Sequence, residues 1–244
     1  MDNFYFMDVA SEPIGIKGKP FEGVCKVSEI VLDKDTAEKF RHAEGKYVTL
    51  ETDVLSEFDE DDHARLSHAL GNKLSSLIED KRKILVVGLG NGNMTADALG
   101  VETCKLIDVS HGINTLCPNV ECNTGIDSFD VVSGVVSRIN PTTVIAIDSL
   151  SAATAFRLGR VIQMCDAGIT PGSGVDNHRK RLSFASLGVP VVSIGVPLVI
   201  YASTIIRDAG GKESGYENMI VTPKDIDYLV RSSASVIAHA INRL

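Results

Sequence analysis

The sequence predicts an α/β fold with three layers, in which helices cover both faces of a mostly parallel, twisted central sheet. Two apolar runs, residues 84–87 and 142–147, are rich in Val and Ile and are typical of strands buried on both faces. Helical segments alternate with such strands along the chain, which favours right-handed βαβ units. The 244 residues are 44% hydrophobic, enough for one sizeable core, and no repeat or linker divides them. We therefore expect a single domain.

The elements can be assigned in chain order. Residues 1–22 contain prolines and glycines that exclude a long helix, so the folded domain is expected to span residues 23–244. Leucines three and four residues apart, behind an acidic start, indicate a helix over 59–78. The predicted strands are 24–32, 47–51, 84–87, 104–109, 142–147, 161–164 and 189–195. The other predicted helices are 36–41, one starting at residue 96, 128–139, 151–158, 197–207 and one opened by Thr222 and Pro223.

Composition excludes several classes of function. The formal charge of −8 argues against binding to a phosphate backbone, and with 5% aromatic residues and no Trp the chain offers no stacking platform for bases. No apolar run approaches the roughly 20 residues of a membrane span, and the N-terminus lacks a signal-peptide pattern, so we expect a cytoplasmic protein without membrane or nucleic-acid partners. The five cysteines are odd in number and match neither a disulfide framework nor a common zinc site. No metal or other cofactor is therefore expected.

The stretch 84–100 carries the strongest local signal, a strand followed by a glycine-rich turn and a helix. Its turn residues permit tight backbone geometry and local hydrogen bonds; they are Gly88, Gly90, Asn91 and Asn93. Asp97 falls in the first turn of the predicted helix, near the positive end of its dipole. The spacing does not fit a dinucleotide fingerprint, because its third glycine would fall on Asn93, and no Gly-Lys-Ser/Thr follows for a P-loop.

Two aspartates stand where the chemistry of such a fold is expected. Asp97 lies just past the end of the strand 84–87, and Asp148 directly follows the strand 142–147. If these strands are neighbours, both carboxylates reach the crevice at the carboxyl edge of the sheet. Two close carboxyls share one proton, and such a pair can activate a water and protonate a leaving group. A helix cap at Asp148 and a dipole partner at Asp97 are equally open at this point.

Four motifs together resemble one known family, the spore germination proteases. They are Val-Val-Gly-Leu-Gly-Asn-x-Asn-x-Thr-x-Asp-Ala-Leu-Gly at 86–100, Ile-Ala-Ile-Asp-x-Leu at 145–150, Asp-x-Gly-Ile-x-Pro-Gly-Ser-Gly-Val at 166–175 and Gly-Val-Pro-Val-Val-x-Ile-Gly-Val-Pro at 188–197. Val-Thr-Pro-Lys at 221–224 fits as well, and the resemblance covers residues 45–244. A more distant similarity to hydrogenase maturation endopeptidases rests on the glycine-asparagine turn.

The resemblance implies a phosphorylase/hydrolase-like α/β fold and an atypical aspartic endopeptidase with Asp97 and Asp148 as its catalytic pair. It also implies degradation of small acid-soluble spore proteins in the forespore or spore core at germination, a self-processing zymogen and a homo-oligomer. We expect main-chain amides of the turn from Gly88 to Asn93, or the N-terminus of the helix that follows, to stabilise the oxyanion. Within and after the third motif, the expected substrate contacts are Asp166, Gly172, Ser173, Arg179, Lys180 and Arg181, the basic ones recognising substrate carboxylates. A solvated charged loop is the plain alternative for the basic run.

The chain departs from the family pattern in three places. Thr170 stands where the family usually has His, Ala96 stands where proline is common, and 208–218 replaces a long insertion, which puts the family's homotetramer in doubt. These departures keep a second hypothesis open, a sporulation factor that binds a partner without cleaving it. A third is a metal-assisted peptidase in which Asp97, Asp148 and Asp166 hold an oxygen-loving ion.

The N-terminal segment resembles the family's own cleavage pattern, an acidic residue followed by an apolar one and Ala-x-Glu. Residues 8–12 read Asp-Val-Ala-Ser-Glu. We predict self-cleavage between Asp8 and Val9, which would release residues 1–8 as a pro-peptide. A chance match in a terminal tail is the alternative.

Overall fold

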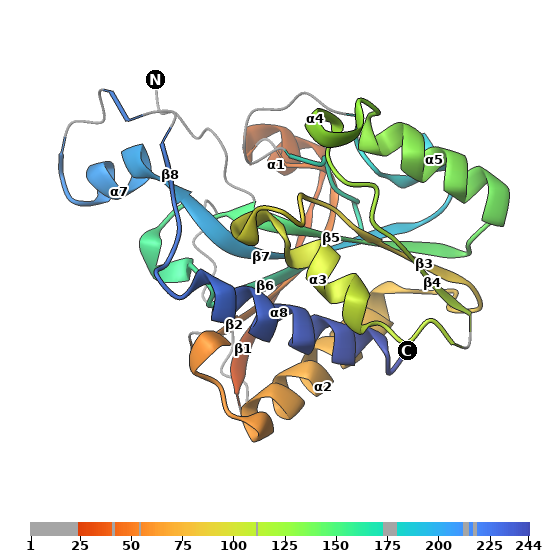
Figure 1. Cartoon of the computed structure of the whole chain (residues 1–244), viewed down its shortest axis with the longest axis horizontal. Helices are drawn as coiled ribbons and strands as arrows, with labels where there is room; N and C mark the ends of the chain where they lie inside the picture. The colour runs from red at the N-terminus through yellow and green to blue at the C-terminus, as the bar shows by residue number, and fades with distance from the viewer. Residues whose placement is uncertain are drawn as a thin grey trace.

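The computed structural model describes residues 24–40, 42–53, 55–110, 112–172, 180–211, 215–216 and 219–244. Within them, eight strands form one sheet in the spatial order β1-β2-β6-β7-β5-β3-β4, and β8 pairs with β7 (Figure 1). The strands are β1 (Cys25–Leu32), β2 (Gly45–Thr52), β3 (Ile84–Gly88), β4 (Ile113–Leu116), β5 (Thr143–Ser151), β6 (Val161–Cys165), β7 (Val191–Tyr201) and β8 (Ile220–Val221).

The sheet has a parallel half and an antiparallel half. The parallel pairs are β7 with β5, β5 with β3, and β3 with β4. β6 pairs antiparallel with β7, β2 with β6, β1 with β2 and β8 with β7. The predicted α/β class is confirmed, and the two apolar runs that predicted it are adjacent strands, β3 and β5, at the centre of the parallel half.

Helices cover both faces of the sheet, which makes the predicted three layers. The α-helices are α1 (Lys34–Phe40), α2 (Glu60–Leu77), α3 (Leu99–Leu106), α4 (Glu121–Thr124), α5 (Ser128–Ile139), α6 (Phe184–Leu187), α7 (Ala202–Asp208) and α8 (Ile226–Ile241). Short 3-10 helices are η1 (Leu55–Glu57), η2 (Thr95–Asp97) and η3 (Ala155–Arg157). In the described part of the chain, none of these helices is long and apolar enough to span a bilayer.

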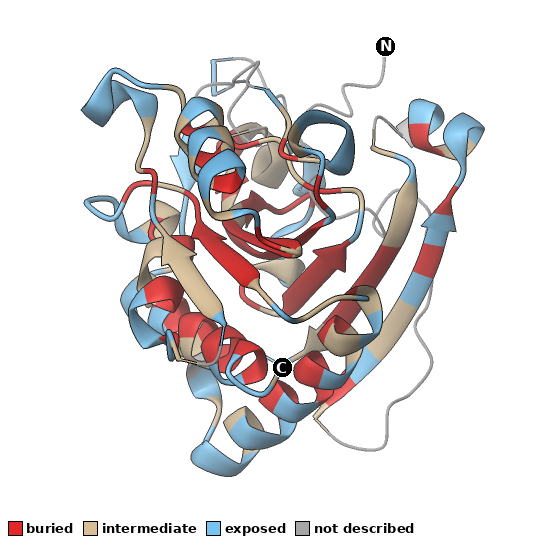
Figure 2. Ribbon diagram, turned by 90° about the vertical axis from the view of Figure 1, so that its right-hand side faces the viewer, coloured by how far each residue is buried: buried red, intermediate tan, exposed pale blue. Residues whose placement is uncertain are grey.

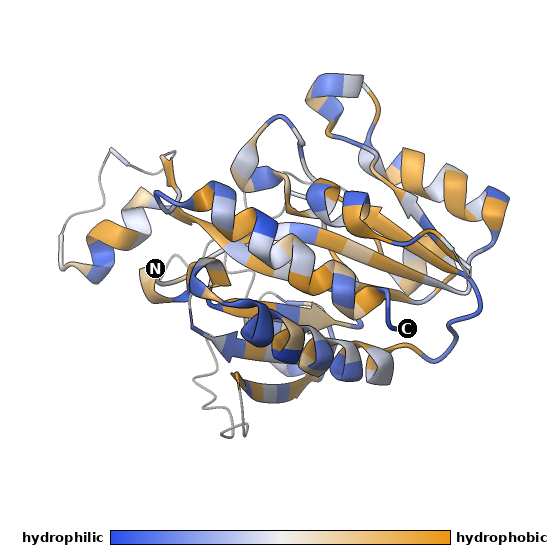
Figure 3. Cartoon of the chain, turned by 60° about the horizontal axis from the view of Figure 1, so that its bottom comes forward, coloured by the Kyte–Doolittle hydropathy of each residue, from blue (hydrophilic) through white to orange (hydrophobic). Residues whose placement is uncertain are grey.

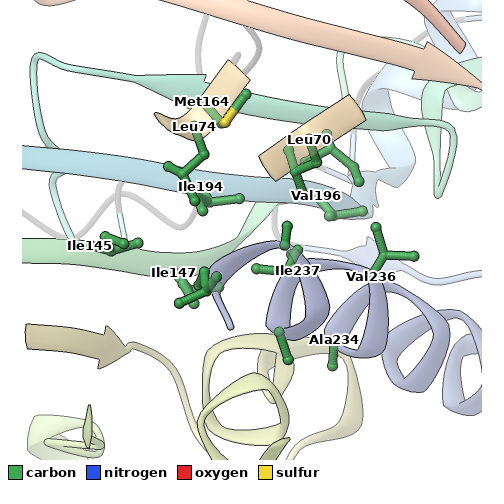
Figure 4. Close-up of a cluster of buried hydrophobic side chains, with 14 of the residues drawn as sticks. Leu70, Leu74, Ile145, Ile147, Met164, Ile194, Val196, Ala234, Val236 and Ile237 are labelled. Atoms are coloured by element: carbon green, nitrogen blue, oxygen red, sulfur yellow. The ribbon is translucent and has the colours of Figure 1, made fainter. Parts of the chain in front are cut away.

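The main core lies between the sheet and the three helices α2, α3 and α8. Alternate residues of β3 and β5 point into it, including Ile145 and Ile147, which are fully buried. Figure 4 shows them packed with Leu70 of α2 and Ile237 of α8. The intervening residues of the same strands face a second cluster under α5. Burial of each such side chain is favourable by roughly 1.5–3 kcal/mol.

The pattern of burial follows from these two cores. Figure 2 shows the central strands buried and the outer strands and the outer sides of the helices more exposed, and Figure 3 shows many apolar residues along the central strands. A side chain caps the start of α2 and the start of α5. Asp59 accepts a hydrogen bond from the main-chain N–H of Asp62 at 2.8 Å, and Asp127 accepts one from that of Phe129 at 2.8 Å. These caps fix where α2 and α5 begin.

The predicted strand over 104–109 is wrong. That segment closes α3, whose buried residues include Leu99 and Cys104, and Val109 beyond it is 63% exposed. A short apolar run does not distinguish a strand from a buried helix segment. Here the segment is helical, because α3 packs on β3. The parallel strand that follows is β4, in a segment for which no strand was predicted.

Two predicted helices are also wrong. Over 151–158 the structure has only the turn η3, and over 197–207 β7 continues through Pro197 to Tyr201 before α7 begins. The pairing of β7 with β6 does not extend beyond Gly195, so Pro197 needs no main-chain N–H on the side that faces β6. On the side that faces β5, Pro197 still pairs with Leu150. Proline therefore marked an edge position of a strand, not the first turn of a helix.

Candidate active site

The two predicted catalytic aspartates lie on neighbouring elements at one edge of the parallel half. Gly88, the last residue of β3, is opposite Ile147 of β5, and the N–H of Leu89 donates to the carbonyl of Ile147 at 2.8 Å. Asp148 is the next residue of β5. Asp97 closes η2, which lies against β5 and β7 with Cα atoms within 8 Å. The predicted adjacency of the two strands is confirmed.

Asp97 is held by the glycine turn before it. The main-chain N–H of Asn91 donates to its Oδ2 at 2.8 Å, and the side chain is partly exposed. Gly90 has a φ of +94°, and a Cβ at this position would lie 2.0 Å from the carbonyl oxygen of Asp97 and 3.0 Å from its Oδ1. Only glycine permits this close approach. The turn therefore places one carboxylate oxygen by a main-chain hydrogen bond and leaves the aspartate accessible.

Asp148 is more deeply placed, inside β5 and not after its end as the sequence suggested. It is 6% exposed and pairs with Gly195 of β7, because β5 and β7 continue in register beyond it. Its Oδ1 accepts a hydrogen bond from the N–H of Ser149 at 2.9 Å. The predicted helix cap at this position does not occur, since no helix follows. A buried carboxylate that lies inside a strand and does not cap a helix is typical of a functional group.

A second layer of amide contacts braces the turn. Asn91 is 8% exposed, and its Oδ1 accepts hydrogen bonds from the N–H of Asn93 at 3.0 Å and from Nδ2 of Asn123 at 3.1 Å. Asn123 lies on α4 and also donates to Oδ1 of Asn119 at 3.0 Å. The N–H groups of Asn91 and Asn93 thus already donate within the turn. An oxyanion bound here would take its hydrogen bonds from other donors than these two.

Asn123 is the residue that sequence analysis missed. Its segment was assigned to a loop, and no motif marked it. The usable signal was composition: Asn119 and Asn123 are four residues apart, the spacing of one helical turn, in a chain whose central turn is itself rich in asparagine.

The loop after β6 reaches this region by a different route from the one expected. β6 is antiparallel to β5 and β7, so its carboxyl end points away from the edge with Asp148. Asp166 is level with Val192 of β7. It is therefore displaced from Asp148 by three residues along the strands, about 10 Å, and by two strands across the sheet, again about 10 Å. The chain then returns over the sheet, and Ile169 packs against Leu150 and Val161.

Asp166 and Gly172 have structural roles where they are described. Oδ1 of Asp166 accepts the N–H of Lys46 at 2.7 Å, and Gly45 leaves room for it, because a Cβ on Gly45 would lie 2.6 Å from that oxygen. Gly172 has a φ of +70°. Across the described residues, no three His, Cys, Asp or Glu side chains are grouped so that they could hold a metal ion. The proposed gathering of Asp97, Asp148 and Asp166 round one ion is therefore wrong.

The two described basic residues of the loop already have partners. Lys180 lies 3.9 Å from Oδ1 of Asp130 and 5.2 Å from the centre of the Phe129 ring. Arg181 donates to the carbonyl of Ala167 at 3.0 and 3.2 Å and to that of Gly168 at 3.0 Å. Its Nη1 is also 3.5 Å from Oγ1 of Thr170. Arg181 thus holds the loop together. Four other residues with predicted roles lie outside the described residues: Ser173, Arg179, Asp8 and Val9.

Comparison with known proteins decides which family this site belongs to. The family model described as germination protease matches residues 8–211. The chain belongs to the germination protease family. It is accordingly a peptidase. The germination protease of Caldanaerobacter subterraneus subsp. tengcongensis is 33% identical over 281 aligned positions, which cover 94% of this chain and 87% of that protein. That of Clostridium tetani is 32% identical, with 96% and 89% covered, and that of Priestia megaterium 36% identical, with 79% and 57% covered.

Both of the first two alignments are longer than the 244 residues of this chain, so these germination proteases contain residues that have no counterpart here. Among solved structures, the [NiFe] hydrogenase maturation protease HycI from Thermococcus kodakarensis KOD1 is similar at a TM-score of 0.45 and 18% identity, covering 70% of this chain and 99% of that one.

Proposed function

We propose that this germination protease cleaves small acid-soluble spore proteins at germination, with Asp97 and Asp148 as an acid–base pair. The observation that carries the proposal is that η2, which contains Asp97, lies against β5, which carries Asp148 one residue beyond its pairing with β3; Asp97 is partly exposed and Asp148 is 6% exposed. One carboxyl of the pair would keep a proton for the leaving amine while the other activates the attacking water. The proposal that these spore proteins are its substrates, in the forespore or spore core, rests on the family resemblance.

The glycine turn supports this mechanism. Gly90 and the N–H of Asn91 fix the position of Asp97, and Asn123 fixes Asn91. A carboxylate that is already held in position can take up or release a proton at the reacting groups without first being oriented, which lowers the barrier to general acid–base catalysis.

Two further features belong to the proposal. The N-terminal segment would be removed between Asp8 and Val9 by the same aspartate pair. The basic loop would contact acidic substrate residues through Arg179 and Lys180. Arg181, Asp166, Gly172 and Ser173 would shape that loop. Assembly into a homo-oligomer is proposed from the family resemblance.

The deciding experiment is cleavage of a small acid-soluble spore protein by purified chain that begins at Val9. Asp97→Asn and Asp148→Asn keep the shape of the side chains but cannot share a proton. We expect each to lower kcat by at least 10³-fold, since removing one member of an acid–base pair removes most of its contribution. Asp61→Asn, a change at an exposed position of α2, is the matched control and should leave turnover unchanged.

Two outcomes would contradict the proposal. Full turnover in both aspartate variants would assign the chemistry to other residues. A wild-type chain that binds the spore protein tightly but leaves it intact would establish the second hypothesis, a factor that binds without cleaving.

A further inference from the structure

Two cysteines from separate elements meet beside the glycine turn. Cys104 is on α3, and Cys117 directly follows β4. In the parallel register Val87 of β3 is opposite Leu116 of β4, so Gly88 is level with Cys117. Gly88 is also where Cys104 packs, since a Cβ on Gly88 would lie 2.8 Å from Sγ of Cys104. The absent side chain at Gly88 thus makes room for Sγ of Cys104 beside the strand position that is level with Cys117.

The two thiols differ in exposure and in acidity. Cys104 is 8% exposed, and Cys117 is exposed. The hydrogen bond from Cys104 lowers the pKa of Cys117 to about 7, against the opposing effect of burial and with help from the charge of Lys105. The same hydrogen bond and burial raise the pKa of Cys104. At neutral pH about half of the accessible sulfur is therefore thiolate, and the buried one keeps its proton.

No other described cysteine has this combination. Burial raises the pKa of Cys25 to about 11 and that of Cys165 to about 11. Cys122 is exposed, and its contact with Oδ1 of Asn123 at 3.7 Å is with an amide oxygen, not a second thiol. Cys122 is therefore the natural internal control for Cys117.

We propose that Cys104 and Cys117 form a peroxide-sensitive dithiol, with Cys117 as the attacking and Cys104 as the resolving thiol. The thiolate of Cys117 attacks hydrogen peroxide, the O–O bond breaks, and Cys117 becomes a sulfenic acid with release of hydroxide. The sulfur of Cys104 then attacks Sγ of Cys117, the S–O bond breaks, and the released hydroxide takes up the proton of Cys104 to form water. In total, two thiols and one peroxide give one disulfide and two waters.

The disulfide would act on the part of the fold that carries the aspartates. It would tie α3 to the end of β4 across Gly88, the first residue of the turn whose Asn91 binds Asp97. α3 itself begins two residues after Asp97. An effect on cleavage rests on the proposed function, whereas the thiol chemistry does not, so it is tested without any cleavage assay.

The first test compares alkylation rates of Cys117 and Cys122 in the intact reduced chain. Iodoacetamide at pH 7 is followed by peptide mass spectrometry. A pKa near 7 instead of about 8.5 gives about 16 times more thiolate. The lower basicity of that sulfur removes part of the gain, so we expect Cys117 to react about three times faster. Cys104→Ala should abolish this difference, and Cys104→Ser, which still donates a hydrogen bond, should retain most of it.

The second test is oxidation by hydrogen peroxide. We expect the intact mass to fall by about 2 Da and a non-reducing digest to contain one peptide pair linked through Cys104 and Cys117. Cys104→Ser should instead accumulate a sulfenic acid at Cys117 that dimedone traps. Cys122→Ser should behave as wild type. Equal alkylation of Cys117 and Cys122, or peroxide oxidation without the linked pair, would overturn the proposal.

Discussion

Single side-chain amides determine the geometry of the candidate active site. Asn91 is the central residue, because its main-chain N–H binds Asp97 while its buried side chain accepts from Asn93 and Asn123. Glycine at position 90 is the other requirement, since any Cβ there would overlap Asp97. The sequence could reveal these turn residues, because glycine and asparagine in a strand-to-helix turn have a local meaning. It could not reveal Asn123, whose contact spans 32 residues.

Asn123 offers the sharpest test at this scale. Asn123→Ala removes the Nδ2 donor to the buried Oδ1 of Asn91, and Asn123→Asp replaces the donor by an acceptor at nearly constant shape. Loss of one hydrogen bond of about 1 kcal/mol to this turn predicts a fall in kcat of about fivefold for Ala, and more for Asp, with KM unchanged. Steady-state cleavage kinetics measure both constants.

Asn72→Ala is the control for these variants, because Asn72 is exposed on α2 and contacts only the neighbouring region of its own helix in the described bonds. If both Asn123 variants turn over substrate as fast as this control, Asn123 has no positioning role.

At the scale of elements, strands were easier to predict than the segments that join them. Composition alone predicts the buried strands β3 and β5. The spacing of apolar residues predicts the helices α2, α5 and α8. The failures share one cause, since segments 104–109 and 197–207 satisfy two local patterns and only their neighbours choose between them. Pro197 is tolerated in a strand because the pairing of β6 with β7 does not extend to it. That fact depends on pairing across the sheet.

The loop between β6 and α6 shows how topology changes the meaning of a charged residue. A basic run after a strand suggested substrate binding, on the assumption that β6 ends at the same edge as β5. Because β6 is antiparallel, the loop must turn back, and the guanidinium of Arg181 satisfies two carbonyl groups that this reversal exposes. Among the described residues Lys180, by contrast, contacts the side chains of Asp130 and Phe129 on α5.

These two neighbours should therefore respond differently to loss of charge. Arg181→Met leaves the carbonyls of Ala167 and Gly168 without their donor and should lower the free energy of unfolding by about 1–3 kcal/mol. Lys180→Met loses a long, exposed ion pair and should change it by less than about 0.5 kcal/mol. Urea denaturation of the two variants measures the difference. Equal stabilities would show that Arg181 does not brace the loop, and a raised KM in Lys180→Met alone would support a substrate contact there.

The whole molecule is a single layer of sheet between two layers of helix, with the aspartates at one edge. The family match covers residues 8–211, and the first two germination proteases compared align over more positions than this chain possesses. The fold class, the enzyme class and the pair of strands that carry the site were all predictable. The path of the antiparallel half was not, because no local pattern states the direction of β6.

Self-processing is a prediction about the whole chain, since it joins the N-terminal segment to the candidate site. Full-length protein incubated at mildly acidic pH should lose residues 1–8, because protonating one carboxyl restores the singly protonated pair. Intact-mass measurement would find a new N-terminus at Val9. Asp97→Asn should stay full length under the same conditions. Wild-type protein that digests substrate yet never begins at Val9 would show that no such zymogen exists.

The order of strands in the sheet also determines when each pairing can first form while the chain is being synthesised. The hairpin of β1 and β2, complete by residue 52, pairs with no strand before β6, and β6 pairs with β7, which ends at residue 201. The helix that closes the main core, α8, ends at residue 241 and packs on both α2 and α3. Pairings between distant parts of a chain form late. On the proposed function, a nascent chain therefore contains the predicted cleavage site at residues 8 and 9 well before the elements around Asp97 and Asp148 are complete, so we expect no self-cleavage until synthesis is nearly finished.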